Sequence, residues 1–551
     1  MTMTHPLSQS QTGIYLTCMN TGGDVNYNMD FLYELTDDID LQRLAAALDK
    51  VIETHPYVKS RLVVTDSGEA AFEDRSAEAF HTPIYDAEDL AEVRGRIGKD
   101  YDLMHDRLFR LEIYRTGHGA YLYQGFHHII FDGISHAAFR EDLEKAYAGE
   151  ALEGEETDGF QIAEREAAAR QSAIYGEAKA WYAQEYGGVG ETDYLPPSDI
   201  FGKEEPQYGK YSEPLNIDRP KTDALCERAG VRESVVFSAA FGITLSKFTC
   251  QDEVACVTGF HGRTDKATRR SLTMTVRTLP LRFNLQQTPT VAELLQATAE
   301  QTRMTRRYDM YSFVDMSNDL GLNADVSFVY HGSIRGNDLH LNGSTQKVTE
   351  ILTNTPGFKF VGMLVYKDDV PYFEVEYLSN RYSREFVDSF KRTFETVVNE
   401  MCVKESVADI ECCDEEGIAQ LDRFNTLNKV PQTMPENETI VSLFQRQASL
   451  QPDHTAVVFG DKRYTYRELD EQTDRIASLI LSTLNSHLGA RHFHHHTSQR
   501  VDGAGLVGSP QGGLRLPAPR PELSARPSEL HGQGCQRRAA HCRRRPSPNR
   551  K

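Results

Sequence analysis

The chain has 551 residues, and 39% of them are hydrophobic, so it is long enough to bury more than one core and to form about three or four domains. Its formal net charge of −21 argues against nucleic acid and anionic membrane surfaces as primary partners. The charge is uneven: residues 481–551 carry twelve Lys or Arg and three Asp or Glu, so residues 1–480 have a formal net charge of −30.

The first part of the chain predicts alternating helices and strands, because apolar residues recur there at helical spacing or at every second position. In chain order we predict a helix over Pro6–Cys18, a strand over Phe31–Thr36, a helix over Asp40–His55, a strand over Arg61–Val64 and a helix over Asp86–Tyr101. Two further strands follow, separated by the turn Thr116–Gly119.

The stretch from Gln124 to His136 contains the residues best suited to chemistry. The apolar and aromatic run Tyr121–Phe131 predicts a buried strand, with His127 and His128 near its end. Because side chains alternate along a strand, only one of the two rings can face a given cleft. Histidine suits proton transfer near neutral pH, since its unperturbed pKa is about 6.5. One ring is therefore a candidate base, and a pair of core histidines is the alternative.

Asp132 and Gly133 predict a turn after this strand, and Ser135 begins a helix that extends to Ala148. The carboxylate of Asp132 could bind an arginine or cap the helix, and so fix the loop that carries the imidazole. Gly133 would allow the backbone to approach a ligand closely. The helix begins with a partial positive charge, so we expect Ser135 to contact substrate there.

The second part of the chain returns to the same alternation. The polar, acidic stretch from Gly149 to Gly159 predicts a connection between two lobes. We expect the sole tryptophan, Trp181, to serve packing. The predicted elements are helices over Glu177–Tyr186 and Ser234–Thr249, strands over Val254–Phe260 and within Thr273–Leu285, two strands near Phe358–Tyr366 and Tyr372–Tyr377, and a long helix over Ser383–Val403.

The C-terminal part differs in composition. Residues 411–438 are polar and predict a linker. From about Asn485 the chain is rich in Arg, Pro, Gly, His and Ser without apolar periodicity, which predicts disorder. The abrupt change suggests the hypothesis of out-of-frame translation over residues 485–551. The cluster His492, His494, His495 and His496 and the run Arg543–Arg545 are interpreted as parts of a solvated tail.

The nine cysteines indicate a reducing compartment. Apart from the vicinal pair Cys412–Cys413 they are scattered, and none has C-x-x-C spacing, so neither a disulfide framework nor a metal site is expected. The first residues lack the apolar segment of a signal peptide, and no run of roughly 18 apolar residues occurs. We therefore expect a cytoplasmic protein with no membrane partner.

The spacing of His127, His128, Asp132 and Gly133, HHxxxDG, resembles the signature of the condensation domains of nonribosomal peptide synthetases. Other segments occur in the order of that family over about 400 residues: Ser8 and Gln11 match its opening segment, and Thr278, Pro280 and Arg282 match a later one, where Arg277 replaces the usual Asn. The resemblance implies an α/β (α+β) fold with two chloramphenicol-acetyltransferase-like lobes, a V-shaped pseudo-dimer with a central tunnel. Residues 1–150 would form the N-lobe and residues 151–410 the C-lobe.

The family resemblance also implies a role for each residue of the motif. His128 would be the reactive imidazole, His127 its support, Asp132 the loop organiser that pairs with an arginine, and Gly133 the close-approach residue. The segment Thr54–Leu62 departs from the family's R-H-E-x-L-R-T, because Thr54 and Lys59 replace both arginines. Arg61 and Arg282 are then the candidate partners of Asp132, and Arg277 and Arg282 are also candidate substrate-binding residues.

The activity implied is an ATP-independent acyl transfer that forms an amide bond between a donor acyl or peptidyl thioester and an acceptor aminoacyl thioester. Both substrates would arrive on the phosphopantetheine of partner peptidyl or acyl carrier protein domains, and other synthetase subunits would be partners. The chain contains no Gly-Gly-x-Ser carrier motif, so we expect no covalently bound cofactor.

Residues 439–484 resemble the start of an adenylation (AMP-binding) domain, since Tyr464–Leu469 matches its first motif. The Gly-rich phosphate loop of such domains does not follow, so adenylation activity is not expected. The alternatives to a condensation domain are a catalytically degenerate docking or recruitment module and a related carrier-dependent acyltransferase for lipo-initiation. An epimerization domain shares the motif but would normally follow a carrier, and a cyclisation domain has Asp in place of the histidines.

Overall fold

The computed structural model describes residues 3–20, 27–189, 194–200, 207–323, 325–333, 337–351, 358–427 and 439–484. The chain divides into two compact units, residues 1–417 and 418–551. Residues 485–551, predicted to be disordered, lie outside the described residues, together with their histidine cluster and arginine run. Residues 428–438 of the predicted linker also lie outside them. None of the helices within the described ranges is long and apolar enough to cross a membrane.

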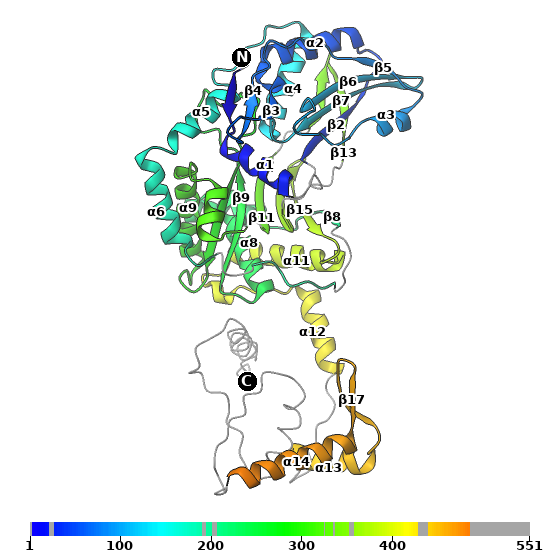
Figure 1. Ribbon diagram of the computed structural model, residues 1–551, viewed down its shortest axis with the longest axis vertical. Coiled ribbons are helices and arrows are strands. Elements are labelled where there is room, and N and C mark those ends of the chain that lie inside the picture. The colour runs from blue at the N-terminus through cyan, green and yellow to red at the C-terminus, as the bar shows by residue number, and fades with distance from the viewer. Residues whose placement is uncertain are drawn as a thin grey trace, which may run out of the picture. The chain divides into compact units, whose positions relative to one another are not determined.

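The first six-stranded sheet has the strand order β12-β13-β2-β7-β6-β5 (Figure 1). Its strands are β2 (Asn28–Leu35), β5 (Ile84–Asp86), β6 (Phe109–Thr116), β7 (Gly119–His127), β12 (Leu339–Leu341) and β13 (Ser344–Ile351). β13 pairs antiparallel with β2, with Val348 opposite Tyr33. A hairpin from the second half of the chain therefore completes the sheet of the first half.

Helices cover both faces of the first sheet. On one face α2 (Leu41–Thr54) and α4 (Gly133–Ala148) pack on each other and share a core with β7 that includes Leu48, Phe126 and Phe139. On the other face Val93 of α3 (Leu90–Arg96) packs with Tyr123 of β7. A smaller sheet has the order β1-β4-β3, formed by β1 (Thr4–Pro6), β3 (Arg61–Val64) and β4 (Ala70–Glu73), and η1 (Pro56–Lys59) precedes β3.

The second six-stranded sheet has the order β10-β9-β11-β14-β15-β8. Its strands are β8 (Tyr208–Pro214), β9 (Glu253–Phe260), β10 (Arg277–Asn284), β11 (Val326–Ser333), β14 (Phe360–Lys367) and β15 (Val370–Leu378). Its core holds stacked and tilted aromatic rings, among them Phe241, Phe328 and Phe390. The helices α7 (Arg219–Ala229), α8 (Glu233–Thr249), α9 (Val291–Arg307) and α11 (Arg384–Met401) pack on it and on one another, and η3 (Val407–Asp409) follows α11.

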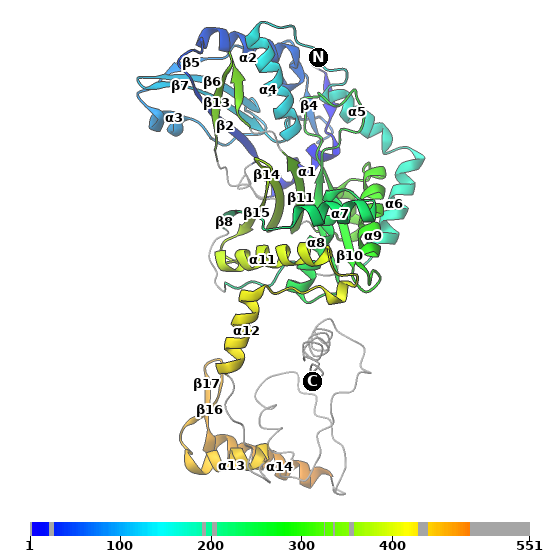
Figure 2. The ribbon, with the colours of Figure 1, turned by 180° about the vertical axis from the view of Figure 1, so that it is seen from behind.

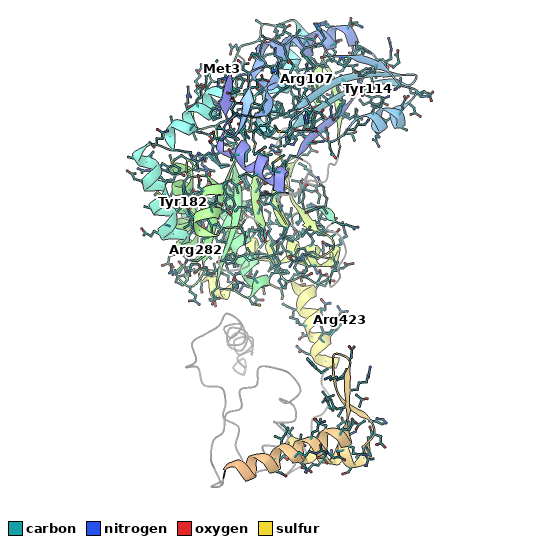
Figure 3. The ribbon with its side chains drawn as sticks, viewed as in Figure 1. Met3, Arg107, Tyr114, Tyr182, Arg282 and Arg423 are labelled. Atoms are coloured by element: carbon teal, nitrogen blue, oxygen red, sulfur yellow. The ribbon has the colours of Figure 1, made fainter. Side chains whose placement is uncertain are left out.

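Three helices connect the two halves of residues 1–417. α1 (Gln9–Asn20) lies between the two large sheets in both views (Figures 1 and 2). The hydroxyl of its Ser10 donates to the carbonyl oxygen of Val276 at 2.6 Å, just before β10. α5 (Gly159–Ala169) packs against β1, and α6 (Ala173–Tyr186) packs against α10 (Phe313–Leu320). Trp181 of α6 contacts Tyr182, labelled in Figure 3, and Tyr308, so its predicted packing role is confirmed.

Helix caps and strand pairing set the ends of several predicted helices. Helix α2 begins as predicted, because the carboxylate of Asp40 accepts from the backbone N–H groups of Gln42 and Arg43. The helix predicted over Asp86–Tyr101 is reduced to α3, since Ile84–Asp86 pairs with β6 and Ile97 is extended. α1 begins only at Gln9, because Thr4–Pro6 pairs with β4.

Residues 415–484 form the remaining described elements. Part of the predicted linker is helical: α12 (Glu415–Leu427) begins within it. The second unit contains α13 (Ile440–Leu450), the antiparallel pair β16 (Thr455–Phe459) and β17 (Lys462–Thr465), and α14 (Tyr466–Leu484), which packs on α13 and on both strands. A short packed subdomain therefore follows the two-sheet unit in sequence.

Candidate active site

The two histidines lie where β7 ends. The strand stops at His127, and residues 128–130 form a turn in which the N–H of Ile130 donates to the carbonyl oxygen of His127 at 3.1 Å. The predicted strand to Phe131 is thus too long, and the helix after it begins at Gly133, two residues earlier than predicted. Asp132 is the reason: its carboxylate caps α4 by accepting from the N–H of Ser135 at 2.9 Å.

The ring of His127 is buried and neutral. It is 4% exposed, and its Nδ1 accepts a hydrogen bond from the backbone N–H of Ile129 at 3.2 Å. Burial and, to a smaller extent, the neighbouring His128 lower the pKa of His127 to about 3. An imidazole that cannot gain a proton near neutral pH and whose Nδ1 is occupied holds the turn rather than transferring protons.

The ring of His128 faces a cavity instead. Its backbone N–H donates to the carbonyl oxygen of Tyr27 at 2.7 Å, and its ring meets the edge of the Tyr27 ring. The Nδ1 atom is buried and has no hydrogen-bond partner among the described residues. Nothing within the described part of the chain therefore fixes the tautomer of His128, in contrast to His127.

The cavity has a volume of about 1650 Å³ and is lined from both large sheets. His128, Gly133 and His136 line it from the first half of the chain, and Phe260 and Val329 line it from the second sheet. A Cβ added at Gly133 would meet no atom within 4 Å, so the backbone is open to the cavity at this point. Small-molecule pockets commonly enclose roughly 300–1,000 Å³, so this space is larger than one small ligand needs.

A buried clamp holds the loop between His128 and α4. Asp132 is fully buried, and its Oδ2 accepts from Arg263 Nη1 at 2.8 Å and from the N–H of Thr275 at 3.1 Å. The Nη2 of Arg263 donates to Ser135 Oγ and to the carbonyl oxygen of Thr273, each at 2.9 Å. Burial alone would raise the pKa of Asp132, but the charge and hydrogen bonds of Arg263 outweigh it and lower the pKa. The loop is thereby tied to the segment between β9 and β10.

Asp132 pairs with Arg263, so the prediction of Arg61 or Arg282 as its partner is wrong. Arg61 lies 3.6 Å from Glu78, and Arg282 pairs with Glu253 at 2.9 Å on the neighbouring strand, so both are committed elsewhere. The sequence held a signal for Arg263 that we missed: His261-Gly262-Arg263 directly follows the predicted strand Val254–Phe260. A glycine turn at a strand end is a position from which an arginine can reach a second lobe.

The predicted substrate-binding residues separate into two groups. Ser135 is fully buried within the clamp, and Arg282 is held by Glu253, so neither lines the cavity and we no longer propose that they contact substrate. Arg277 does line the cavity. It is 9% exposed, forms an ion pair with Glu166 and donates to Ser10 Oγ at 3.1 Å. Its charge is therefore largely neutralised by the protein.

His55 lies between two carboxylates behind the clamp. Its Nε2 is 2.8 Å from Asp142 on α4, and its Nδ1 is 2.8 Å from Glu155 in the connection between the lobes. Burial alone would lower the pKa of His55, but the hydrogen bonds and charges of Asp142 and Glu155 outweigh it and raise the pKa. The protonated ring of His55 thus links Glu155, in the connection between the lobes, to Asp142 on α4.

This arrangement predicts a pH-dependent stability. Since the pKa of folded His55 lies above the unfolded value of about 6.5, its contribution is complete below that pH and is lost as the pH rises through the folded-state pKa. We expect the urea midpoint, followed by Trp181 fluorescence, to fall less steeply from about pH 6 to about pH 9 in His55→Gln than in wild type. The exposed His81, beside Asp49, gives the control: His81→Gln should retain the wild-type slope.

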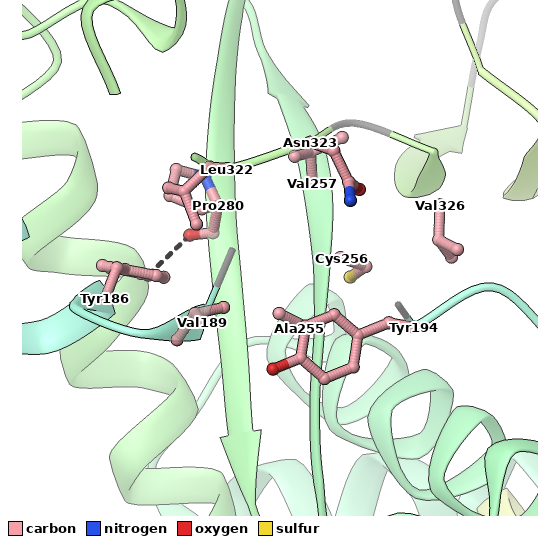
Figure 4. A pocket seen from close by; sticks show the side chains of 10 residues that line it. All are labelled: Tyr186, Val189, Tyr194, Ala255, Cys256, Val257, Pro280, Leu322, Asn323 and Val326. Atoms are coloured by element: carbon pink, nitrogen blue, oxygen red, sulfur yellow. Dashed lines mark hydrogen bonds between the residues drawn. The ribbon is translucent and has the colours of Figure 1, made fainter. Parts of the chain in front are cut away.

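A second pocket, between α6 and strands β9 and β10, offers no comparable chemistry (Figure 4). Its volume is about 20 Å³, room for about one water molecule. The hydroxyl of Tyr186 donates to the carbonyl oxygen of Pro280 across it at 2.8 Å. Burial raises the pKa of the Cys256 thiol in its wall to about 12, so this thiol is not a nucleophile near neutral pH.

Comparisons with known proteins agree with this architecture. Residues 1–419 match the family model described as the condensation domain. Surfactin synthase subunit 1 of Bacillus subtilis (strain 168) is 25% identical over 510 residues, which cover 87% of this chain and 14% of that protein. Bacitracin synthase 1 of Bacillus licheniformis is 25% identical over 492 residues, which cover 86% of this chain and 9% of that protein. The chain thus spans less than a fifth of the length of these relatives.

Solved structures share the fold. The first condensation domain of the calcium-dependent antibiotic synthetase has a TM-score of 0.60 at 18% identity, over 75% of this chain and 99% of that chain. The starter condensation domain of rhizomide synthetase has a TM-score of 0.62 at 18% identity, over 75% of this chain and 100% of that chain. The predicted α/β fold is therefore confirmed.

Proposed function

The chain belongs to the condensation-domain family, whose model matches residues 1–419, and from this premise we propose that it forms an amide bond between two carrier-bound thioesters. The donor is an acyl or peptidyl thioester and the acceptor an aminoacyl thioester. The observation that carries the proposal is the ring of His128, which lines a cavity of about 1650 Å³ beside the open backbone of Gly133. A cavity of this size has room for two substrate arms and an imidazole between them.

The reaction needs one proton transfer and no ATP. The acceptor amine nitrogen attacks the carbonyl carbon of the donor thioester, a C–N bond forms, the C–S bond breaks, and the proton lost by the amine balances the one gained by the thiolate. His128 accepts the amine proton or holds the amine by a hydrogen bond. The first turn of α4, which begins at Gly133, adds partial positive charge where oxygen becomes negative in the tetrahedral intermediate.

The other site residues act through His128. His127 supports the turn from within the core, and Asp132 with Arg263 holds the loop between the turn and α4. Because the clamp leaves little freedom to that loop, the imidazole would need no rearrangement when substrates arrive. We propose His127 and Asp132 as positioning residues and His128 as the catalytic one.

The partners follow from the substrates. Both thioesters would be carried on phosphopantetheine of peptidyl or acyl carrier protein domains, and the relatives named above are subunits of large synthases. We propose that the chain works beside such domains in the cytoplasm. Residues 439–484 would be the opening part of an adenylation domain.

A direct assay tests this function. The chain is mixed with acyl- and aminoacyl-pantetheine thioesters of several side-chain types, and then with carrier proteins loaded with the same groups. We expect amide products, detected by mass spectrometry, to form faster than in mixtures without the chain. If no pair gives amide while Trp181 fluorescence reports a folded protein, the proposal is wrong.

The open space at Gly133 gives a prediction for the same assay. Gly133→Leu would place an isobutyl group on the wall of the cavity that His128 also lines, and its Cβ would meet no protein atom within 4 Å. We therefore expect kcat/KM for amide formation to fall at least about tenfold while the urea midpoint stays near wild type. Gly176 lies at an exposed position of α6, where an added Cβ also meets no atom within 4 Å, so Gly176→Leu is the matched control and should retain activity. Full activity in Gly133→Leu would show that substrates do not pass this residue.

A further inference from the structure

His261 is a further imidazole on the wall of the cavity, contributed by the second half of the chain. It directly follows β9 of the second sheet, whereas His128 directly follows β7 of the first sheet. Both rings line the same space; His128 is half-buried and His261 is more exposed. The mechanism above makes no use of His261.

The tautomer of His261 is fixed by its own turn. The backbone N–H of Arg263 donates to Nδ1 of His261 at 3.0 Å, so Nδ1 must be unprotonated. In a neutral imidazole the proton then lies on Nε2, which makes this atom a hydrogen-bond donor. Burial lowers the pKa of His261, and the charges of Arg263 and Arg306 lower it further, so the neutral form persists near neutral pH.

The turn that carries His261 is rigid. Gly262 has a φ of +68°, and a Cβ there would collide with the carbonyl oxygen of Thr275, so only glycine fits. The hydroxyl of Thr275 donates to the carbonyl oxygen of His261 at 2.8 Å, and the next residue, Arg263, binds Asp132. The same clamp therefore fixes the loop that carries His128 and the loop that carries His261.

The charges around His261 favour one substrate over the other. Arg306 lines the cavity, and its guanidinium lies over the ring of Phe260, 4.4 Å from the ring centroid. Phe260 directly precedes His261 in the sequence. Arg263 is the residue bonded to Nδ1. Asp132 balances the charge of Arg263, whereas Arg306 lines the cavity as a cation. The charge of Arg306 disfavours an ammonium group at this wall, as on an aminoacyl acceptor, and leaves the uncharged carbonyl of the donor thioester as the better acceptor for an N–H.

We propose that His261 donates a hydrogen bond from Nε2 to the carbonyl oxygen of the donor thioester and so positions this carbonyl for attack. The inference rests on the amide-forming function proposed above and adds a residue from the second sheet to its site. It assigns the donor arm to the wall formed by His261. No proton leaves His261 in this role.

Two substitutions separate a hydrogen-bond donor from mere bulk. His261→Phe keeps a ring and lacks the N–H, so we expect kcat/KM for amide formation to fall about tenfold. His261→Gln keeps a side-chain N–H near the position of Nε2 and should retain most of the activity. Trp181 fluorescence in urea checks that both variants fold, and His118→Ala, on the exposed turn between β6 and β7, controls for the loss of a histidine elsewhere.

Binding of two inert donor analogues gives a readout that a structural role would not change. In one, CH₂ replaces the sulfur of a hexanoyl-pantetheine thioester and the carbonyl remains; in the other, CH₂ also replaces the carbonyl. Wild type and His261→Gln should bind the ketone about tenfold more tightly than the analogue without it, and His261→Phe should bind both alike. Wild-type activity or an unchanged ketone preference in His261→Phe overturns the inference. A wild-type chain that forms no amide contradicts the proposed function itself.

Discussion

Replacing His128 with alanine is expected to lower the rate of amide formation by at least about 100-fold, the usual lower range for loss of a positioned acid or base. The ring is half-buried, and the described residues form no hydrogen bond with its nitrogens, so its removal should change the fold little. Single-turnover assays with loaded carrier proteins measure the effect, because they separate the chemical step from carrier exchange.

Two controls give this result its meaning. His118→Ala removes an exposed histidine of the β6–β7 turn and should leave the rate unchanged. Trp181 fluorescence should show the same urea midpoint for His128→Ala and wild type. A His128→Ala variant that forms amide at the wild-type rate would remove His128 from the mechanism and leave it only a packing role.

Replacing Arg263 with alanine is expected to destabilise the two-sheet unit by about 3–5 kcal/mol, because the carboxylate of Asp132 would remain buried without a charge partner. Arg263 also donates to Thr275 Oγ1 and to the carbonyl oxygens of Ser271 and Thr273, so these acceptors lose their donor as well. Arg263→Lys should lie between wild type and alanine, since one ammonium cannot reproduce the forked contacts. Urea unfolding followed by Trp181 fluorescence measures the loss, because the only tryptophan lies in this unit.

Arg282 provides the matched control for Arg263. It also forms an ion pair on the second sheet, at 2.9 Å from Glu253, but its side chain is 27% exposed against 2% for Arg263. Arg282→Ala should therefore cost no more than about 1 kcal/mol. Equal losses in the two variants would show that the buried clamp does not hold the unit together.

The strands and helices were predictable where short-range signals decide them. Asp40 and Asp132 cap α2 and α4 through backbone N–H groups two or three residues away, and such contacts can be recognised in the sequence. β3 has the predicted bounds Arg61–Val64. The errors lie at element ends: the strand with His127 is shorter than its apolar run, because residues 128–130 form a turn and are not paired in a sheet, although Ile129 and Ile130 are buried.

Only the site residues that lie close together in the sequence were predictable. The spacing of His127, His128, Asp132 and Gly133 specifies a turn, a cap and two rings that face different ways, and the structure has all of these. Arg263 and His261 were missed, because they belong to a loop of the second half of the chain. The spacing of residues in the sequence does not predict the distance between two loops that come together only when the two sheets pack.

By itself the sequence determined the alternation of helices and strands, the helix caps and the local geometry around His128, since these depend on propensity and on contacts within a few residues. Only the tertiary structure decided that Asp132 meets Arg263, 131 residues away, that β13 extends the first sheet beside β2, and that His261 shares the cavity with His128. The physical reason is that burial selects these partners: a carboxylate removed from water must find a cation, and an open sheet edge must find a strand, whichever part of the chain supplies it.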